Sequence, residues 1–294
     1  MNIGFIGLGI MGCPMSKNLV KKGYNLIVYD INKPKVDEVV ELGAKRGDSI
    51  KDVASKSDIL ITMLPNSPQV KDVVLGEGGA AEALKEGSIL IDMSSIAPLA
   101  SKEVAEKLAE RNIEMLDAPV SGGEPKAIDG TLSIMVGGKE EIFNKCKDLL
   151  LAMGSSAVHC GDIGAGNVTK LANQIIVALN IAAMSEAFVL GNKAGVSPEL
   201  IYNAIRGGLA GSAVLDAKAP MAMDRNFKPG FRIDLHIKDL ANAVETGAAV
   251  GAPLFLTNQV LEMMRTLQLD GEGKSDHSAL IKFYEKLGKT EVSK

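Results

Sequence analysis

Continuous runs of apolar residues alternate with helical patterns through the first half of the chain. Runs at residues 2–6, 26–29, 59–64, 89–91 and 113–118 predict strands buried on both faces, because they lack the polar alternation of a half-exposed strand. Between them apolar residues recur at helical spacing, as from Met15 to Leu19 before a stop at Gly23. This order indicates a parallel sheet with helices on both faces. Strands at 131–136 and 157–159, around a helix at 140–153, are expected to complete it.

The segment from Gly161 to Gly195 predicts one long helix, because no proline or glycine interrupts it between Gly166 and Gly191. Apolar residues lie nearly all round this helix, which indicates burial between other elements. It is a poor candidate for a membrane span because polar amides interrupt it, namely Asn173, Gln174 and Asn180. After residue 195 helical patterns dominate and no strand pattern remains.

Composition and charge exclude several classes of protein. The chain is 46% hydrophobic and 23% charged, as in a globular protein, and its net charge of −4 gives no support for a nucleic-acid partner. No disulfide framework or metal site is indicated, because the cysteines are few and scattered: Cys13, Cys146 and Cys160. The first strand begins at residue 2 and leaves no room for a targeting peptide, so we expect a cytoplasmic protein without a membrane partner.

A glycine-rich turn follows the first strand. Gly7 would permit a tight turn, Gly9 close approach of the main chain to a pyrophosphate, and Gly12 close packing of helix on strand. The following helix would direct its free N–H groups at the phosphates. Asp30, eighteen residues beyond Gly12, would bind a ribose and repel a 2′-phosphate. We therefore predict a dinucleotide site that prefers NAD, with NADP possible, formed by Gly7, Leu8, Gly9, Ile10, Met11, Gly12 and Asp30. The alternative is a tight strand-to-helix turn that binds no dinucleotide.

Three loops follow predicted strands and lie where ligands of parallel sheets bind. Leu64 and Pro65 open one and Ser95 lies in the next, so these residues are expected to border the nicotinamide half of the cofactor. Prolines are also common in loops that bind no ligand, and this would explain them equally well. In the third, Ser121, Gly122 and Gly123 would present N–H groups and a hydroxyl to a carboxylate, or form a flexible turn.

Lys170 is the candidate for acid–base chemistry. It lies in the first turns of the long helix, with Asn173 and Gln174 on the same face. Burying a lysine is costly, and burial beside another positive charge would lower its pKa toward the range of a useful proton donor. The alternative is a structural lysine paired with Glu186.

Two other groups of polar residues give weaker signals. Lys238 and Asp239 share a predicted helix face with Leu235 and form either a functional pair or a solvated one. His159 ends a predicted strand and is interpreted as structural. No role is assigned to His236 or His277. The predicted fold is thus an α/β Rossmann-type dinucleotide-binding domain with a mostly parallel sheet (residues 1–162), joined by the long helix to an all-α domain (163–294).

The motifs together resemble those of the β-hydroxyacid dehydrogenase family. The opening segment 5–19, the segment 117–123, Gly164-Ala165-Gly166 with Lys170, and Lys238-Asp239 occur in the family's order and cover essentially the whole chain. The resemblance implies a helical domain used in oligomerisation, giving a homo-dimer or homo-tetramer, and an active site between the two domains.

The resemblance also implies roles for individual residues. Lys170 matches the catalytic lysine, and Asn173 matches an amide that orients the substrate. Ser121, Gly122 and Gly123 match the substrate-carboxylate loop, and Lys238 matches a residue near nicotinamide and substrate. Gln174 stands where many members carry asparagine, which puts its role in doubt.

Within the family, segments 122–127, 170–186 and 205–240 are most similar to members that reduce tartronate semialdehyde (2-hydroxy-3-oxopropanoate) reversibly to glycerate. Dehydrogenases of 3-hydroxyisobutyrate or 2-(hydroxymethyl)glutarate are the alternatives among enzymes. A non-catalytic nucleotide-sensing protein on the same fold is the alternative outside them.

Overall fold

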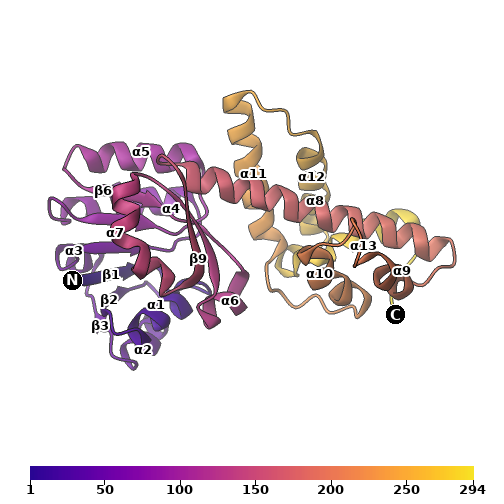
Figure 1. The fold of residues 1–294 in the computed structure, drawn as a ribbon, viewed down its shortest axis with the longest axis horizontal. Coiled ribbons are helices and arrows are strands. Elements are labelled where there is room, and N and C mark those ends of the chain that lie inside the picture. Colours follow the sequence, from indigo (N-terminus) through magenta and orange to yellow (C-terminus); the bar gives the residue numbers. More distant parts are fainter. The chain divides into compact units, whose positions relative to one another are not determined.

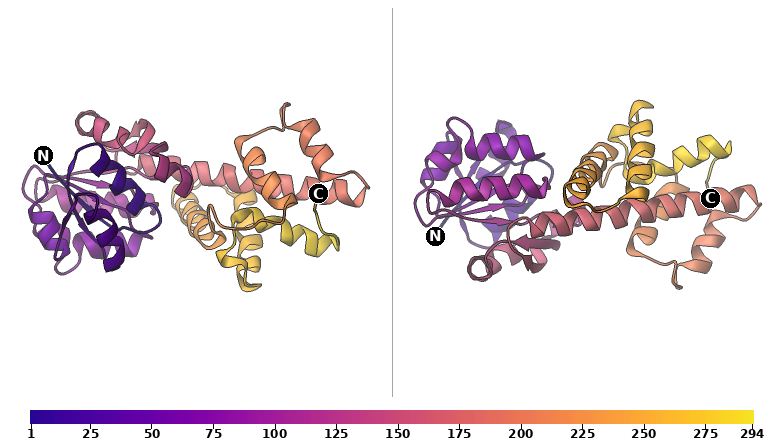
Figure 2. Two further views of the ribbon diagram at one scale, coloured as in Figure 1. Left: turned by 90° about the horizontal axis from the view of Figure 1, so that it is seen from below. Right: turned by 90° about the horizontal axis from the view of Figure 1, so that it is seen from above.

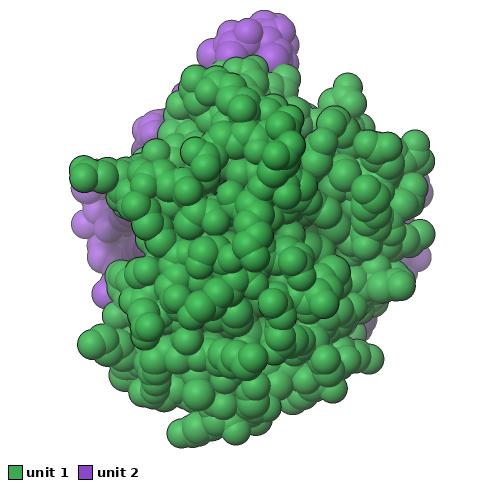
Figure 3. Space-filling model, turned by 90° about the vertical axis from the view of Figure 1, so that its left-hand side faces the viewer, with its two compact units in different colours: residues 1–170 green, residues 171–294 purple.

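A computed structural model describes residues 1–294, which divide into two compact units, residues 1–170 and 171–294 (Figures 1 and 3). The sequence placed the domain boundary between residues 162 and 163, just before the long helix. The division by packing lies further along the chain, between Lys170 and Leu171, inside that helix. Each unit is described separately below.

Unit 1 is built on a nine-stranded, mostly parallel sheet. Its strand order is β3-β2-β1-β4-β5-β6-β8-β7, with β9 paired to β8. The first six strands pair in parallel, and β8 runs antiparallel to β6 and β7. The strands are β1 Asn2–Ile6, β2 Asn25–Tyr29, β3 Lys45–Arg46, β4 Ile59–Thr62, β5 Ile89–Asp92, β6 Glu114–Asp117, β7 Val120–Ser121, β8 Leu132–Gly137 and β9 Gly154–Gly161. The predicted Rossmann-type α/β fold is confirmed.

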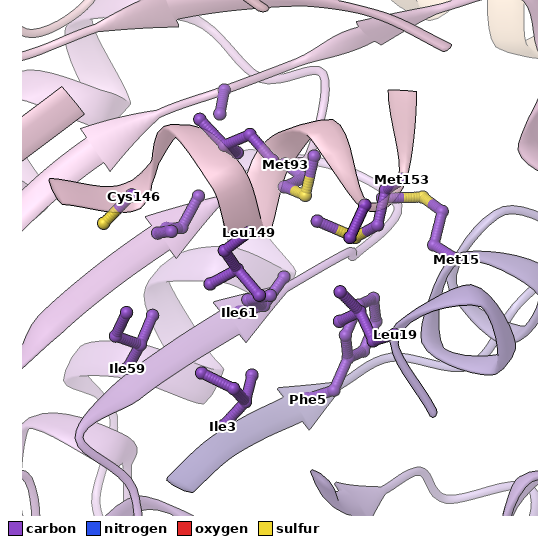
Figure 4. Close-up of a cluster of buried hydrophobic side chains, with 14 of the residues drawn as sticks. Ile3, Phe5, Met15, Leu19, Ile59, Ile61, Met93, Cys146, Leu149 and Met153 are labelled. Carbon is purple, nitrogen blue, oxygen red and sulfur yellow. The ribbon is translucent and has the colours of Figure 1, made fainter. Parts of the chain in front are cut away.

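Helices cover both faces of this sheet, as the continuous apolar strands predicted. Alternate residues of one strand enter different cores: Ile59 and Ile61 belong to one cluster, and Leu60 to the other. Figure 4 shows the first cluster, where Met15 and Leu19 of α1 and Leu149 of α7 pack near Ile3 and Phe5 of β1. The helices of unit 1 are α1 Gly12–Lys21, α2 Lys33–Val40, α3 Ile50–Ser55, α4 Ser67–Leu75, α5 Pro98–Ala109, α6 Gly123–Asp129 and α7 Glu140–Leu151, with a 3-10 turn η1 at Ala80–Glu82.

Polar residues align at the carboxyl ends of three neighbouring strands. Thr62 of β4 is in register with Asp92 of β5, and Asp92 with Asp117 of β6. All three side chains are buried. Buried polar residues at this edge of a parallel sheet mark the region where such folds bind ligands.

Unit 2 is entirely helical, as predicted. Its apolar core includes Phe188 of α8, Leu240 of α11 and Met264 of α12. Helices α11 and α12 lie against each other (orange and gold in Figure 2). Its elements are the greater part of α8 Ala165–Lys193, then α9 Pro198–Ile205, α10 Ala213–Met223, α11 Ile233–Val250, α12 Phe255–Leu269 and α13 Ile281–Gly288, with 3-10 turns η2 Glu272–Lys274 and η3 His277–Leu280.

The prediction that α8 is buried all round is wrong for one face. Ile176 and Leu190 are 61% and 71% exposed, and the exposed residues between them on the same stripe are alanines, Ala183 and Ala187. An apolar composition on every face therefore does not reveal which face the chain itself covers. By length and composition α8 could also cross a membrane, a criterion that the core helix of a water-soluble protein meets equally well.

Candidate active site

The three glycines of the turn after β1 differ in what a side chain at each position would meet. Gly7 has φ +98°, and a Cβ there would lie 2.3 Å from the carbonyl oxygen of Met63. A Cβ on Gly12 would lie 1.9 Å from the carbonyl oxygen of Gly7, so only glycine lets α1 start this close to the turn. Around Gly9, in contrast, no heavy atom lies within 4 Å of the Cβ position. Two glycines thus serve the turn itself, and Gly9 leaves space for a ligand.

Asp30 ties the end of β2 to the glycine turn. Its carboxylate accepts hydrogen bonds from the main-chain N–H of Leu8 at 2.5 Å and of Asn32 at 2.6 Å. Asp30, Lys33 and Arg46 line a cavity of about 300 Å³ beside this strand end. A second cavity, of about 320 Å³, borders Gly9 and Ile10. Met11, before α1, makes no side-chain cap, so the helix N-terminus has no anionic cap of its own.

These features fit a dinucleotide. Open space at Gly9 beside an N-terminus without a side-chain cap suits a pyrophosphate. Asp30 on the wall of the neighbouring cavity suits the adenosine ribose. The residues present would therefore hold the phosphates at the start of α1 and the ribose at the end of β2.

Asp92 orders the two loops that were expected to border the nicotinamide. Its Oδ1 accepts from the hydroxyls of Thr62 at 2.8 Å and Ser94 at 2.6 Å. Ser94 Oγ in turn accepts from the N–H of Leu64 at 2.8 Å, which joins the β4 loop to the β5 loop. Complete burial raises the pKa of Asp92 to about 6, although the hydrogen bonds from Ser94 and Thr62 oppose this rise. Pro65 is exposed in the first loop and Ser95 is half-buried in the second.

Asp117 holds the start of α8. Its two oxygens accept from the main-chain N–H groups of Gly164 and Asn167, both at 2.7 Å. Asn167 then bonds the N–H of Ile96 at 3.1 Å and the hydroxyl of Ser101 at 3.1 Å. Burial raises the pKa of Asp117 to about 6 against the lowering effect of these N–H donors. The beginning of α8, which carries Lys170 on its second turn, is thereby fixed to the sheet.

The Ser121 loop has a main chain that only glycine adopts readily. Gly122 has φ +137° and Gly123 has φ +68°, and α6 begins at Gly123. Ser121 is the last residue of β7 and pairs with Ser133 of β8. A loop that turns through two such glycines presents its N–H groups without side-chain obstruction, which suits an anionic group of a ligand.

Lys170 is buried, with 6% of its surface exposed. The alternative pairing with Glu186 is wrong, because the two residues are sixteen positions apart in one helix, which separates them by roughly 24 Å along the axis. Glu186 is exposed. Asn173 and Gln174 lie one turn further along α8 and are half-buried and buried.

In unit 2, Gln174 joins α8 to α11. Its Nε2 donates to Oδ2 of Asp239 at 2.7 Å, and its Oε1 accepts from Nδ2 of Asn173 at 2.9 Å. Lys238 Nζ lies 3.1 Å from Oδ1 of Asp239, whose side chain is 1% exposed. The suggestion of a solvated Lys238–Asp239 pair is therefore wrong. The extra methylene of Gln174, which the sequence left unexplained, spans the distance to Asp239.

For several polar residues of the two units, the sequence gave no indication of their partners. Asp92, Asp117 and Asn167 act through partners that become neighbours only when the sheet forms. His236 and His277 form a buried pair, with their Nδ1 atoms 2.9 Å apart. His159, interpreted as structural, bonds the carbonyl of Gly138 at 2.6 Å through Nε2 and stacks on Phe143.

The comparisons with known proteins agree with the Rossmann-type fold of unit 1 and the helical fold of unit 2. Residues 2–161 match the NAD binding domain of 6-phosphogluconate dehydrogenase, and residues 164–284 match the family described as NAD-binding of NADP-dependent 3-hydroxyisobutyrate dehydrogenase. The fold and these family matches define an NAD(P)-dependent oxidoreductase with a Rossmann-type domain. The chain belongs to the family of β-hydroxyacid dehydrogenases, of which 3-hydroxyisobutyrate dehydrogenase is a member.

Three relatives illustrate the similarity. The 2-hydroxy-3-oxopropionate reductase of Escherichia coli (strain K12) is 44% identical over 285 residues, 97% of each chain. The 2-(hydroxymethyl)glutarate dehydrogenase of Eubacterium barkeri is 39% identical over 100% of this chain and 98% of its own. A solved structure of Mycobacterium tuberculosis 3-hydroxyisobutyrate dehydrogenase with L-serine matches with a TM-score of 0.90 at 31% identity, over 96% of this chain and 98% of that one.

Proposed function

We propose that the protein reduces tartronate semialdehyde to glycerate with NADH, reversibly, and that Lys170 is the general acid and base. The observation that carries the proposal is a buried lysine one helical turn before an amide pair. The chain that holds it is 44% identical over 97% of its length to a 2-hydroxy-3-oxopropionate reductase. In this proposal residues 1–162 bind the dinucleotide, and residues 163–294 serve substrate binding and oligomerisation.

Lys170 supplies the proton that the reduction requires. Bound at the glycine turn, NADH would supply the hydride for the aldehyde carbon of the substrate. The carbonyl oxygen then carries negative charge, which the Lys170 ammonium stabilises and neutralises by giving up a proton. In the oxidative direction neutral Lys170 takes the proton from the hydroxyl group. The fixed start of α8 limits the positions that this side chain can reach, which favours proton transfer at one defined oxygen.

The substrate carboxylate is assigned to the Ser121 loop. Ser121 offers a hydroxyl, and Gly122 and Gly123 offer N–H groups without obstructing side chains. Asn173 orients the substrate through its amide, and Lys238 adds a positive charge near substrate and nicotinamide. Gln174 holds Asn173 and Asp239, which restricts the rotamers that Asn173 and Lys238 adopt.

NADH is the cofactor we favour over NADPH. Asp30 carries a carboxylate beside the cavity at the end of β2 and would repel a 2′-phosphate. Of the two cations that line the same cavity, Lys33 and Arg46, the second is already paired with Asp37. Gly7, Leu8, Gly9, Ile10, Met11 and Gly12 are assigned to the phosphates, and Leu64, Pro65 and Ser95 to the nicotinamide side.

A second copy of the chain is the partner we infer for the exposed face of α8. Ile176, Ala183, Ala187 and Leu190 form an apolar stripe along it. The alanines allow a second helix to approach closely, and a homo-dimer or homo-tetramer would remove this stripe from water.

One experiment tests the function. NADH consumption is followed with tartronate semialdehyde for wild type, Lys170→Ala and the matched control Lys193→Ala, an exposed lysine at the end of the same helix. We expect turnover by wild type and control, and a loss of at least about a hundredfold in Lys170→Ala. Equal turnover in Lys170→Ala would remove the proton donor from the proposal.

The second candidate substrate is 2-(hydroxymethyl)glutarate, because a dehydrogenase of that compound is 39% identical over the whole chain. The oxidation of 2-(hydroxymethyl)glutarate and of 3-hydroxyisobutyrate is therefore measured beside that of glycerate. A higher kcat/KM for either would replace tartronate semialdehyde as the substrate and leave the role of Lys170 in place. Tight NADH binding with no turnover of any of them would support a nucleotide sensor instead.

A further inference from the structure

Two histidines far apart in the sequence form a buried pair in unit 2. His236 of α11 is fully buried and His277 of η3 is 4% exposed. Their Nδ1 atoms are 2.9 Å apart, and Phe231 packs edge-on against both rings. On its other side His236 places Nε2 at 3.1 Å from the main-chain carbonyl oxygen of Gln174. A buried contact between two ring nitrogens is stable only if one donates a proton and the other accepts it.

The contact with Gln174 fixes which nitrogen carries each proton in the state where His236 is neutral. A carbonyl oxygen only accepts, so Nε2 of His236 must be protonated. Neutral His236 then has a bare Nδ1, and the proton between the two rings belongs to Nδ1 of His277. An additional proton on Nε2 of His277 would leave both hydrogen bonds intact. The direction of donation therefore runs from His277 to His236 to Gln174.

Asp276 anchors the segment at the His277 end of this chain of hydrogen bonds. Its carboxylate lies 3.0 Å from Nζ of Lys218 and accepts from the N–H groups of Gly230 at 2.9 Å and Phe231 at 3.1 Å. The residue next to it, His277, is thereby held against the loop that leads into α11.

At the other end of this chain of hydrogen bonds lies Gln174, which also bonds the amide of Asn173 on α8. The main-chain oxygen of Gln174 accepts from His236, while its side chain bonds Asp239 and Asn173. His236 and Asp239 are three residues apart on α11, so they share one face of that helix. Two hydrogen bonds from this face to a single residue of α8 fix how the two helices are rotated against each other. They therefore fix where Lys238 and Asn173 project.

We propose that His236 and His277 are positioning residues for the reduction: their directed hydrogen-bond chain sets the register of α11 on α8 and so the placement of Lys238 and Asn173 on the substrate. This inference rests on the proposed function for its kinetic consequence. Its structural content, the two protonated nitrogens, does not depend on the substrate.

The protonation pattern is tested first, by ¹⁵N NMR of the histidine rings in the full chain. The chain has three histidines, and a His159→Gln variant assigns the remaining two signals to the pair. We expect at neutral pH a protonated Nε2 and a bare Nδ1 in His236, and a protonated Nδ1 in His277. A bare Nε2 in His236 would overturn the proposal, whatever the enzyme reduces.

The kinetic consequence is tested with two amides at position 236. In His236→Gln the amide nitrogen takes the place of Nε2 and keeps the bond to Gln174. In His236→Asn the amide group takes the place of Nδ1 and faces only His277. We expect His236→Gln to keep kcat/KM for the aldehyde within about threefold, and His236→Asn to lower it about tenfold or more.

The outcomes separate this inference from the proposed function. Equal losses in the two variants would show a general structural defect and overturn the positioning role. If His236→Asn does not give the wild-type circular dichroism spectrum, His236→Gln and the NMR tautomers decide. Absence of turnover by wild type with every aldehyde would refute the proposed function, while the NMR result would still test the hydrogen-bond chain.

Discussion

The side-chain amide of Gln174 donates to Oδ2 of Asp239 at 2.7 Å and accepts from Asn173 at 2.9 Å. Asp239 is 1% exposed and lies against Lys238 Nζ at 3.1 Å. A buried carboxylate tolerates its charge here because an amide and an ammonium both face it. Asp239 therefore links the amide of Gln174 on α8 to the ammonium of Lys238 on α11.

Removing this amide should affect both stability and turnover. Gln174→Ala leaves Oδ2 of Asp239 buried without its donor, and we expect a loss of roughly 1–3 kcal/mol in the free energy of unfolding. Turnover of the aldehyde should fall as well, because Asn173 and Lys238 lose their common support. Urea unfolding and steady-state kinetics measure the two effects. The matched control is Asn180→Ala, an amide on the same helix that bonds the carbonyl of Ile176; an equal effect there would argue against a special role for Gln174.

Charge alone should not replace Lys170. Lys170→Arg keeps the positive charge and nearly the length of the side chain, but a guanidinium does not release its proton in the range of enzyme activity. We expect the arginine variant to be as slow as Lys170→Ala, within about tenfold, in stopped-flow measurements of NADH oxidation. Substantial activity in Lys170→Arg would show that Lys170 acts by electrostatic binding rather than by proton transfer.

The parts of the fold with local causes were readable from the sequence. The strand at residues 59–64 is a continuous apolar run, and the structure contains β4 Ile59–Thr62 with both faces buried. The glycine turn combines a fixed spacing with an acidic residue at the end of the next strand, and both properties belong to contiguous segments.

The supports of the candidate site have causes that are not local. Asp117 and Asn167 are fifty residues apart, and their hydrogen bond depends on where β6 ends relative to the start of α8. The His236–His277 contact spans 41 residues and depends on how η3 folds back against α11. Single residues of this kind carry no periodic pattern, so the sequence offers Lys170 as a candidate with its neighbours on the same helix and leaves its neighbours from other elements undetermined.

Gly9 and Gly12 should separate ligand binding from folding. An added Cβ at Gly12 would meet the carbonyl of Gly7 at 1.9 Å, whereas at Gly9 nothing lies within 4 Å. Gly12→Ala should therefore cost roughly 1–3 kcal/mol or more of stability. Gly9→Ala should keep the melting temperature of the free protein but weaken NADH binding about tenfold, because its methyl group occupies the approach of the pyrophosphate. Calorimetric titration with NADH and thermal unfolding test both; unchanged NADH binding in Gly9→Ala would place the pyrophosphate elsewhere.

The apolar stripe of α8 should control assembly. Ile176→Glu puts a charge at a side chain that is 61% exposed in the single chain, so it should leave the fold intact and disrupt an oligomer that covers the stripe. Leu209→Glu is the control, since Leu209 is fully exposed and lies outside the helices. Sedimentation velocity should show smaller species for Ile176→Glu only. A monomeric wild type, or an unchanged Ile176→Glu oligomer, would contradict the assignment of this face.

Asp92 should make part of the stability depend on pH in the direction opposite to that of an ordinary salt-bridged carboxylate. Its pKa is raised by burial from 3.8 to about 6, so between these values the folded state holds a proton that the unfolded chain releases. The stabilisation of the fold by this proton is complete below the pKa of the unfolded chain, 3.8, and is lost as the pH rises through about 6. For a shift of this size it amounts to roughly 3 kcal/mol.

Asp92→Asn removes the titration and keeps the shape of the side chain. The difference in unfolding free energy, wild type minus variant, should therefore be larger near about pH 4.5 than near about pH 7.5 by about 2 kcal/mol, because at pH 4.5 most but not all of the effect is present. Urea unfolding at the two pH values measures it, and because every other titrating group is common to both proteins, an equal difference at both would show that Asp92 is ionised throughout the range.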